Sequence, residues 1–278
     1  MDTTLYHPRV SDDGLKVLTN AIRLLIPKRR RKYDLELVVR AILHRIDNGC
    51  KWRSVGSAAL PWHVAYDYYR RWARDYVIDV ANAMIVNMLR FAEAMARTMI
   101  GAPSPAPSPE PPTLLVVDAK SIPSGVFGRR EDHGYDGYKR VKGVKLHCGV
   151  DARGHLLACL GTGANAHDGP RAVEVIAVAR ALGFDALRRG LGDGAYAASA
   201  PACAHLGVAF ESTTVPEAKK LKANGFEPIP VRWVIERTFS HLAFARAFGV
   251  SHERLTRHLE ATAMWAHVAL ALRQIEKL

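Results

Sequence analysis

The stretch Leu114-Leu-Val-Val-Asp118 decides the expected fold of the second half of the chain. Its four apolar residues are typical of a strand buried in a sheet, and they place an aspartate at the C-terminal end of that strand. Because burying an unpaired charge is unfavourable by several kcal/mol, this carboxylate requires a partner from elsewhere in the chain.

Two acids further along the chain are candidates for that partner. Asp193 lies between two glycines in residues 191–196, and Glu236 lies in a segment with helical periodicity that begins near residue 231. Each acid alone also has a common structural explanation, as a turn residue or as half of a surface ion pair with Arg232. Their ordered combination on strand, strand and helix predicts a site for divalent cations, because carboxylates are the hard oxygen ligands that Mg²⁺ prefers. Two such ions can activate the attacking oxygen of a phosphodiester cleavage and neutralise the leaving oxygen.

The composition narrows both the class of protein and the class of partner. The 278 residues are 49% hydrophobic and 24% charged, which is typical of a globular protein. The net charge of +12, of which residues 1–100 contribute 17 basic against 10 acidic residues, indicates a polyanionic partner, either nucleic acid or a membrane surface. Apolar runs are too short to span a membrane and the N-terminus lacks a signal-peptide core, so a cytoplasmic location is expected. The four cysteines lack metal-ligand spacing and are expected to be reduced thiols.

A proline- and serine-rich segment at residues 101–113 divides the chain. It can form neither a helix nor a central strand, so it is expected to be a linker between two domains. We therefore expect a helical domain at residues 1–100 and a second domain at residues 114–278.

The first domain is expected to contain a pair of helices that touch DNA. Asp34 and Gly49 are expected to cap one helix, and a second helix is expected to begin at Pro61 with an aromatic stripe of Trp62, Tyr66 and Tyr69. The pair resembles a helix-turn-helix unit, but an aromatic stripe at helical spacing is also typical of a buried core. Clustered basic residues favour contact with phosphates over base reading. The residues expected to contact DNA in this domain are Lys28, Arg29, Arg30, Arg31, Lys32, Arg70 and Arg71.

The second domain is expected to combine a mixed sheet with flanking helices. Antiparallel strands are expected at 114–117, 143–150 and 156–160, followed by a helix at 172–182 and a strand at 187–191. A helix from about residue 231 to Gly249, with Ala245 on its buried stripe, and a final helix capped by Ser251 complete the domain. This element order is that of a ribonuclease-H-like domain, so the fold class expected is mixed α/β or α+β, preceded by a small helical domain.

Several short motifs extend along nearly the whole chain. In the first domain they are Gly49-Cys-Lys-Trp-Arg-Ser54 and Tyr69-Arg-Arg-Trp72. In the second domain they are Val117-Asp-Ala-Lys-Ser-Ile122, Gly137-Tyr-Lys-Arg-Val-Lys-Gly-Val-Lys-Leu-His147, Val150-Asp-Ala-Arg-Gly-His155, Ala164-Asn-Ala-His-Asp168, Gly192-Asp-Gly-Ala-Tyr196 and Arg232-Trp-Val-Ile-Glu-Arg-Thr-Phe239. In these motifs and in their order, the sequence resembles the DDE transposases of bacterial insertion sequences, and most of all the group named after insertion sequence five.

This resemblance implies an enzyme that cuts DNA at the ends of an insertion sequence and joins the freed 3′-hydroxyl to target DNA. Asp118, Asp193 and Glu236 match the catalytic acids of the family, which implies a site for two Mg²⁺ or Mn²⁺ ions. Arg232 matches an arginine that contacts DNA four residues before the glutamate. The implied partner is double-stranded DNA, both the terminal inverted repeats and the target. Joining two ends to one target implies a homodimer or a larger assembly, associated with the nucleoid.

The chain departs from the pattern of the family at two positions beside the last acid. Ile229 stands where a tyrosine is frequent, and Ala243 stands where a lysine or a similar residue is frequent. Arg237 and Arg246 are candidates for the missing phosphate contact.

Basic and histidine side chains lie close to the first acidic strand in sequence. Lys139, Arg140, Lys142 and Lys145 are expected to contact DNA phosphates near the acids, although an ordinary solvated edge strand carries such residues too. His147 and the pair His167 and Asp168 are expected to form a hydrogen-bonded structural group rather than a metal site, because further ligands at helical spacing are missing.

Two other classes of protein compete with the transposase interpretation. A catalytically silent DNA-binding regulator derived from a transposase would bind DNA without cleaving it, and the intact set of three acids argues against it. A recombinase with a C-terminal tyrosine nucleophile is excluded, because no tyrosine follows Tyr196. A metal chelator would abolish cleavage by a DDE enzyme and spare a recombinase that forms a covalent intermediate.

Overall fold

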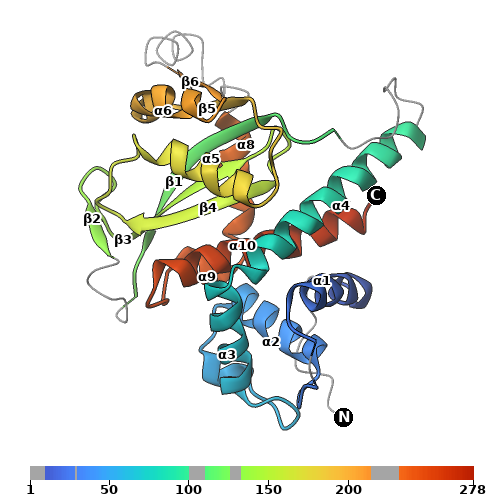
Figure 1. The fold of residues 1–278 in the computed structure, drawn as a ribbon. Helices are drawn as coiled ribbons and strands as arrows, with labels where there is room; N and C mark the ends of the chain where they lie inside the picture. The colour runs from blue at the N-terminus through green and yellow to red at the C-terminus, as the bar shows by residue number, and fades with distance from the viewer. Residues whose placement is uncertain (1–9, 29, 100–109, 126–132, 214–231) are drawn as a thin grey trace. The chain divides into compact units, whose positions relative to one another are not determined.

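The computed structural model of the chain describes residues 10–28, 30–99, 110–125, 133–213 and 232–278 (Figure 1). The chain divides into two compact units. The helical unit comprises Met1–Glu110, Ala243–Gly249 and Arg257–Leu278, and the sheet unit comprises Pro111–Leu242 and Val250–Thr256. None of the described helices is both long enough and apolar enough to cross a membrane.

The helical unit begins with helices that follow the local sequence signals. The Asp34 side chain accepts a hydrogen bond from the Glu36 N–H, and Gly49 ends the same helix in the left-handed conformation at φ 63°, as predicted. The next long helix begins at Trp62, one residue after the predicted Pro61. The elements of this unit are α1 (Asp12–Leu25), α2 (Leu35–Asn48), η1 (Trp52–Val55), α3 (Trp62–Arg74), α4 (Val77–Met99), α9 (Arg246–Gly249) and α10 (Thr256–Ile275).

The last helix of the chain lies in the core of the helical unit. The Tyr69 hydroxyl on α3 donates to the carbonyl of His258 on α10 over 2.6 Å, and the buried Trp265 ring lies 6.1 Å from Trp72. Residues 257–278 therefore belong with the N-terminal helices, whereas the predicted second domain included them. Periodicity identifies a buried helix but does not tell which other helices share its core.

The segment that joins the two units also differs from the prediction. The helix expected to run to Gly249 ends at Leu242 as α8 (Arg232–Leu242), and Ala245 is buried in the helical unit. Ser251 does not cap α10, because this helix begins only at Thr256. Instead, the Ser251 backbone N–H donates to the carbonyl of Pro123 over 2.8 Å. This pairing holds the segment before α10 against the sheet unit.

The sheet unit is built on a six-stranded mixed sheet. The central strand β1 pairs with β3 in the antiparallel sense and with β5 in the parallel sense, and β5 continues in parallel to β6. On the other side of β3 lie β4 and the short β2, both antiparallel. The strands are β1 (Leu114–Pro123), β2 (Gly134–Asp136), β3 (Val141–Val150), β4 (Leu156–Gly163), β5 (Arg189–Asp193) and β6 (Ala209–Thr213).

Two helices cover opposite faces of this sheet, α5 (Arg171–Ala181) and α8 (Figure 1). A Cβ atom on Gly149 would lie 2.8 Å from Val175 of α5 and 2.9 Å from Leu115, so these odd-numbered positions face α5. The Lys120 ammonium lies 5.8 Å from the Phe239 ring centre, so the even-numbered positions of β1 face α8. Asp118 therefore lies on the face of the sheet that α8 covers.

Candidate active site

Asp118 and Asp193 lie level with each other on adjacent parallel strands. The last paired residues of β1 and β5 are Val116 and Leu191, and each aspartate follows its paired residue by two positions. The strand predicted to end at Asp118 continues to Pro123, because its antiparallel pairing with β3 extends beyond its pairing with β5. Both aspartates are half-buried, at the point where the parallel pairing stops.

Backbone N–H groups fix one carboxylate oxygen of each aspartate. The Ala119 N–H donates to Asp118 Oδ1 over 2.7 Å, and the Ala195 N–H donates to Asp193 Oδ1 over 2.9 Å. Asp193 thereby caps the 3₁₀ helix η3 (Gly194–Ser199). Gly192 permits this turn to pack closely, because a Cβ atom there would lie 3.0 Å from the Phe210 ring.

Glu236 lies on α8, the helix that covers the same sheet face as Asp118. Its neighbours Ile235 and Phe239 are buried, whereas Glu236 itself is exposed. Among the residues that the structure describes, no three acidic, histidine or cysteine side chains are close enough to hold one metal ion. The structure thus places two acids level with each other and the third on the covering helix, without gathering all three at one point.

The hydroxyl of Tyr196 is affected by the negative charges of nearby aspartates. Its side chain is fully buried, and its hydroxyl makes no hydrogen bond within the described part of the chain. Burial raises the pKa of this hydroxyl, and the negative charges of Asp168, Asp118 and Asp193 raise it further. Each of the three aspartates therefore acts electrostatically on this one buried hydroxyl.

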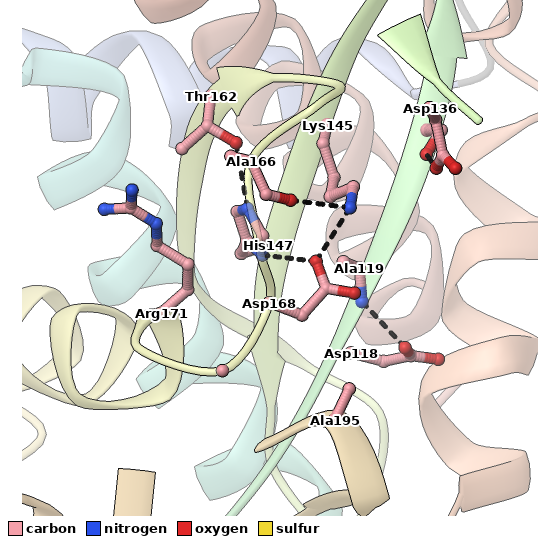
Figure 2. Close-up of polar contacts among 12 residues, drawn as sticks. Asp118, Ala119, Asp136, Lys145, His147, Thr162, Ala166, Asp168, Arg171 and Ala195 are labelled. Atoms are coloured by element: carbon pink, nitrogen blue, oxygen red, sulfur yellow. Dashed lines mark hydrogen bonds and ion pairs between the residues drawn. The ribbon is translucent and has the colours of Figure 1, made fainter. Parts of the chain in front are cut away.

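A buried polar network joins Lys145, Asp168 and His147; the two basic residues lie on β3 opposite Ser121 and Ala119, on the α5 face of the sheet. Figure 2 shows the Asp168 carboxylate between the other two side chains, with Oδ1 at 3.0 Å from Lys145 Nζ and 3.8 Å from His147 Nδ1. The second histidine nitrogen lies 3.0 Å from the hydroxyl of Thr162. Burial lowers the pKa of His147 to about 4, which makes Lys145 the cation that pairs with Asp168 at neutral pH.

This network corrects two expectations. The Lys145 side chain is only 9% exposed and lies against Asp168, so it is not displayed for contact with DNA as predicted. His167 is exposed, and the structural partners of Asp168 are Lys145 and His147 instead. The motif that contains Asp168 is recognisable in the sequence. Its partner Lys145 is found only from the structure, because the pair depends on which face of β3 the lysine occupies and on how close the β4–α5 loop lies to that strand.

The turn before β3 presents basic side chains next to the first acid. Asp136 accepts hydrogen bonds from the Ser121 hydroxyl over 2.6 Å and from the Lys139 N–H over 3.0 Å, and these bonds lower its pKa. Lys139 is exposed, and its Nζ lies 3.3 Å from the carbonyl of Ala119, which directly follows Asp118. Arg140 and Lys142 are exposed as well.

The basic residues of the helical unit are only partly available to a partner. Lys28, Arg30 and Lys32 are exposed, whereas Arg31 donates to the carbonyl of Pro27 over 2.6 Å. Arg29 and the side chain of Arg232 lie outside the described residues.

The aromatic stripe of α3 serves two purposes. Tyr69 is fully buried and belongs to the core, as the competing interpretation of the stripe expected. On other faces of the helix, the Arg70 guanidinium lies 5.5 Å from the Tyr66 ring centre and Arg71 lies 4.6 Å from Tyr68. The connection between α2 and α3 covers residues 49–61 and includes η1, so it is longer than the turn of about three to four residues usual in helix-turn-helix units.

The two arginines considered for the missing phosphate contact have different surroundings. Arg237 donates to the carbonyl of Arg153 over 2.6 Å and lies 4.7 Å from the Trp233 ring centre. Arg246 belongs to the helical unit. Ile229, where the family often has a tyrosine, lies outside the described residues.

The donor set at the candidate site suits a hard divalent cation. Asp118, Asp193 and Glu236 offer only carboxylate oxygens, which Mg²⁺ and Mn²⁺ prefer over nitrogen or sulfur. Asp118 and Asp193 both raise the pKa of Tyr196 through their negative charges, and a bound cation would neutralise these charges. The residues present therefore fit such ions.

The sheet thus carries Asp193 at the end of β5 and Asp118 within the adjacent β1, and the exposed Lys139 reaches the carbonyl of the residue after Asp118. Comparison with protein families identifies the class of protein. A model of the transposase DDE domain matches residues 109–273, and a model described as a putative transposase of the IS4/5 family matches residues 17–82. The chain belongs to the transposase DDE domain family and is a transposase of the IS4/IS5 type. No curated protein and no solved structure matches it.

Proposed function

We propose that the chain is a metal-dependent DNA transposase in which Asp118, Asp193 and Glu236 hold two Mg²⁺ or Mn²⁺ ions. The observation that carries this proposal is the level placement of the two aspartates on adjacent parallel strands, with the glutamate on the helix over the same face. We further propose a ribonuclease-H-like fold for the catalytic part. The order β4-β3-β1-β5-β6, antiparallel on one side of β1 and parallel on the other, supports it.

The chemistry requires two displacements at phosphorus. In the first, a water oxygen attacks the phosphodiester at the element end, and the bond from phosphorus to the 3′-oxygen breaks. In the second, the freed 3′-hydroxyl attacks a target phosphodiester and displaces the target's 3′-oxygen. The second step makes one phosphodiester for each one that it breaks, so it needs no nucleotide energy source. Bound ions supply Lewis-acid activation and charge neutralisation to both steps.

The residues of the chain orient the acids and the DNA. The Ala119 and Ala195 N–H groups hold Oδ1 of Asp118 and of Asp193, respectively. Because Oδ1 is held, the direction of Oδ2 in each carboxylate is set as well. Glu236, on an exposed turn of α8, completes the ligand set when ions and DNA bind. Lys139, Arg140 and Lys142 contact the phosphates of the strand that lies over Asp118, because they are exposed and Lys139 already reaches the neighbouring carbonyl.

The helical unit supplies the remaining affinity for double-stranded DNA. Lys28, Arg30, Lys32 and Arg70 are exposed and basic, which favours contact with the phosphates of the terminal repeats. A pair of ends joined to one target requires at least two copies of the chain. This activity would take place at the nucleoid.

Nicking of labelled element-end DNA in the presence of Mg²⁺ tests the proposal. Asp118→Asn, Asp193→Asn and Glu236→Gln are each expected to lower the nicking rate by roughly 10³-fold, because each removes a ligand worth several kcal/mol of transition-state stabilisation. Chelation of the metal should have the same effect. Asp185→Asn, which changes an exposed aspartate in the α5–β5 connection, is the matched control and should nick normally.

Two results would contradict the proposal. Normal nicking by all three variants would show that the site is elsewhere. Specific binding of the ends by the wild-type protein without any nicking, at any Mg²⁺ or Mn²⁺ concentration, would favour the catalytically silent regulator.

A further inference from the structure

The loop that joins β4 to α5 is held on one side by a buried lysine. Lys145 Nζ on β3 donates to the carbonyl of Ala166 over 2.9 Å and lies 3.0 Å from Asp168 Oδ1 (Figure 2). A single ammonium group thus fixes both the backbone and a side chain of this loop. Its own side chain is 9% exposed, so water offers little competition for these contacts.

The other side of the same loop rests on the turn that follows β5. The Ser199 hydroxyl at the end of η3 donates to the carbonyl of Gly169. A Cβ atom on Gly169 would lie 3.2 Å from the carbonyl oxygen of Ala195, which is tighter than an ordinary contact. The backbone of the loop therefore packs directly on the backbone of η3.

The turn in contact with the loop is the one that orients Asp193. The Ala195 N–H donates to Asp193 Oδ1 over 2.9 Å, so the orientation of the carboxylate follows the position of residue 195. A continuous series of contacts leads from Lys145 through Asp168 and Gly169 to Ala195 and then to Asp193.

We propose that Lys145 and Asp168 are positioning residues, an internal ion pair that fixes the β4–α5 loop against η3 and thereby sets the orientation of the Asp193 carboxylate. This inference rests on the proposed function, because it takes Asp193 to be a metal-binding acid. Neither side chain of the pair needs to touch DNA or metal.

The choice of charged residues supports a positioning role over a role in stability alone. Replacing a buried ion pair by apolar side chains of similar volume is often neutral or stabilising, so a charged pair is a poor way merely to hold a loop. An ion pair does restrict the geometry of its partners, because donor and acceptor must meet at a defined distance. Burial keeps the His147 imidazole neutral at pH 7, so Lys145 and not His147 forms the ion pair with Asp168.

The test compares three variants by nicking rate, by affinity for Mn²⁺ measured from the electron paramagnetic resonance of the free ion, and by melting temperature. Asp168→Asn keeps an oxygen for Lys145 but removes the charge. It should lower both the nicking rate and the Mn²⁺ affinity by about 10- to 100-fold, the usual effect of losing a group that orients a metal ligand. Affinity for element-end DNA should stay within about twofold of wild type, because this pair carries no phosphate contact.

The double variant Lys145→Met with Asp168→Leu separates positioning from folding. Removing both charges should return the melting temperature to within about 4 °C of wild type. The nicking rate and the Mn²⁺ affinity should stay at least about tenfold low, because the apolar pair does not fix the loop in the same position. Arg189→Met, which breaks the exposed Arg189–Glu211 ion pair between β5 and β6, is the matched control and should change none of these quantities.

Two outcomes overturn the inference. They are wild-type Mn²⁺ affinity in Asp168→Asn, or full recovery of nicking in the double variant. Asp193→Asn, assayed in parallel, shows which idea has failed. If Asp193→Asn nicks normally, the proposed function fails; if it is inactive while the double variant nicks like wild type, only the positioning role fails.

Discussion

An ion pair of Arg257 in the helical unit and an ion pair of Lys145 in the sheet unit both involve a largely buried cation, but their settings differ. In the helical unit, Arg257 on α10 pairs with Asp79 on α4, whose side chain is 2% exposed, and with Glu260 over 2.8 Å. In the sheet unit, Lys145 pairs with Asp168, whose side chain is 26% exposed. The first carboxylate is sealed from water and the second retains access to it.

The difference indicates that similar chemistry serves two purposes. The Arg257 guanidinium also donates to the carbonyl of Ala73 over 2.7 Å, and it joins residues 178 positions apart in the chain. It therefore fixes the last helix to the first ones, which is a task of folding. The Lys145–Asp168 pair joins β3 to the β4–α5 loop, which packs on the turn after Asp193, and its expected effect is on the site more than on the fold.

The largest effect on stability is expected from Arg257→Met. The variant leaves Asp79 buried without its cation, and removing one partner of a buried pair destabilises proteins by roughly 3–5 kcal/mol. Urea denaturation followed by circular dichroism measures this loss. Lys16→Met, which breaks an exposed pair with Asp13, is the control and should leave the free energy of unfolding at the wild-type value within experimental error. A loss below about 1 kcal/mol for Arg257→Met would contradict the assigned role.

Acid should destabilise both units through buried histidines. Burial lowers the pKa of His147 and of His258 from 6.5 to about 4. The unfolded chain binds these protons more tightly than the folded one, so their contribution is complete above pH 6.5 and is lost as the pH falls towards 4. Each histidine accounts for ~3 kcal/mol of that loss. Unfolding free energies measured between pH 7 and pH 4 should fall less steeply in His147→Gln and in His258→Gln, and equal slopes in all three proteins would contradict the prediction.

A smaller loss is expected from Lys145→Met. Asp168 keeps some access to water, so its unpaired charge should destabilise the sheet unit by about 1–3 kcal/mol, less than the loss in Arg257→Met. The same urea measurement compares the two variants directly. Equal losses in the two would remove the distinction between the sealed and the accessible pair.

The smallest effect, of opposite sign, is expected from Tyr196→Phe. The Tyr196 hydroxyl is buried and makes no hydrogen bond with any described residue. Its removal should stabilise the sheet unit by up to about 1 kcal/mol, because no bond is lost and a buried polar group disappears. A loss above about 1 kcal/mol would reveal a partner for this hydroxyl in the folded protein.

The features that local sequence predicted are those that local physics fixes. Asp34 and Gly49 cap α2 because capping depends on a few neighbouring residues. The antiparallel strands β1, β3 and β4 follow from alternation and from the turn at residues 151–154. Asp118 and Asp193 were predicted as site residues because an acid after an apolar run is conspicuous; the register of β1 and β5 places them level, and their role as metal ligands stays a prediction.

The features that sequence missed depend on contacts between distant residues. Membership of α10 in the helical unit rests on pairs such as Tyr69 with His258, 189 positions apart, which no local pattern reveals. Lys145 looked like a surface residue in a basic run. Its burial follows only from the loop that carries Asp168 folding back onto β3.

Anomalous diffraction from crystals of the protein with element-end DNA and Mn²⁺ tests the central claim most directly. The account predicts manganese peaks about 2.2 Å from carboxylate oxygens of Asp118, Asp193 and Glu236, with the three acids drawn together around the ions. Manganese bound elsewhere, with Glu236 turned away from both aspartates while DNA occupies the site, would contradict it.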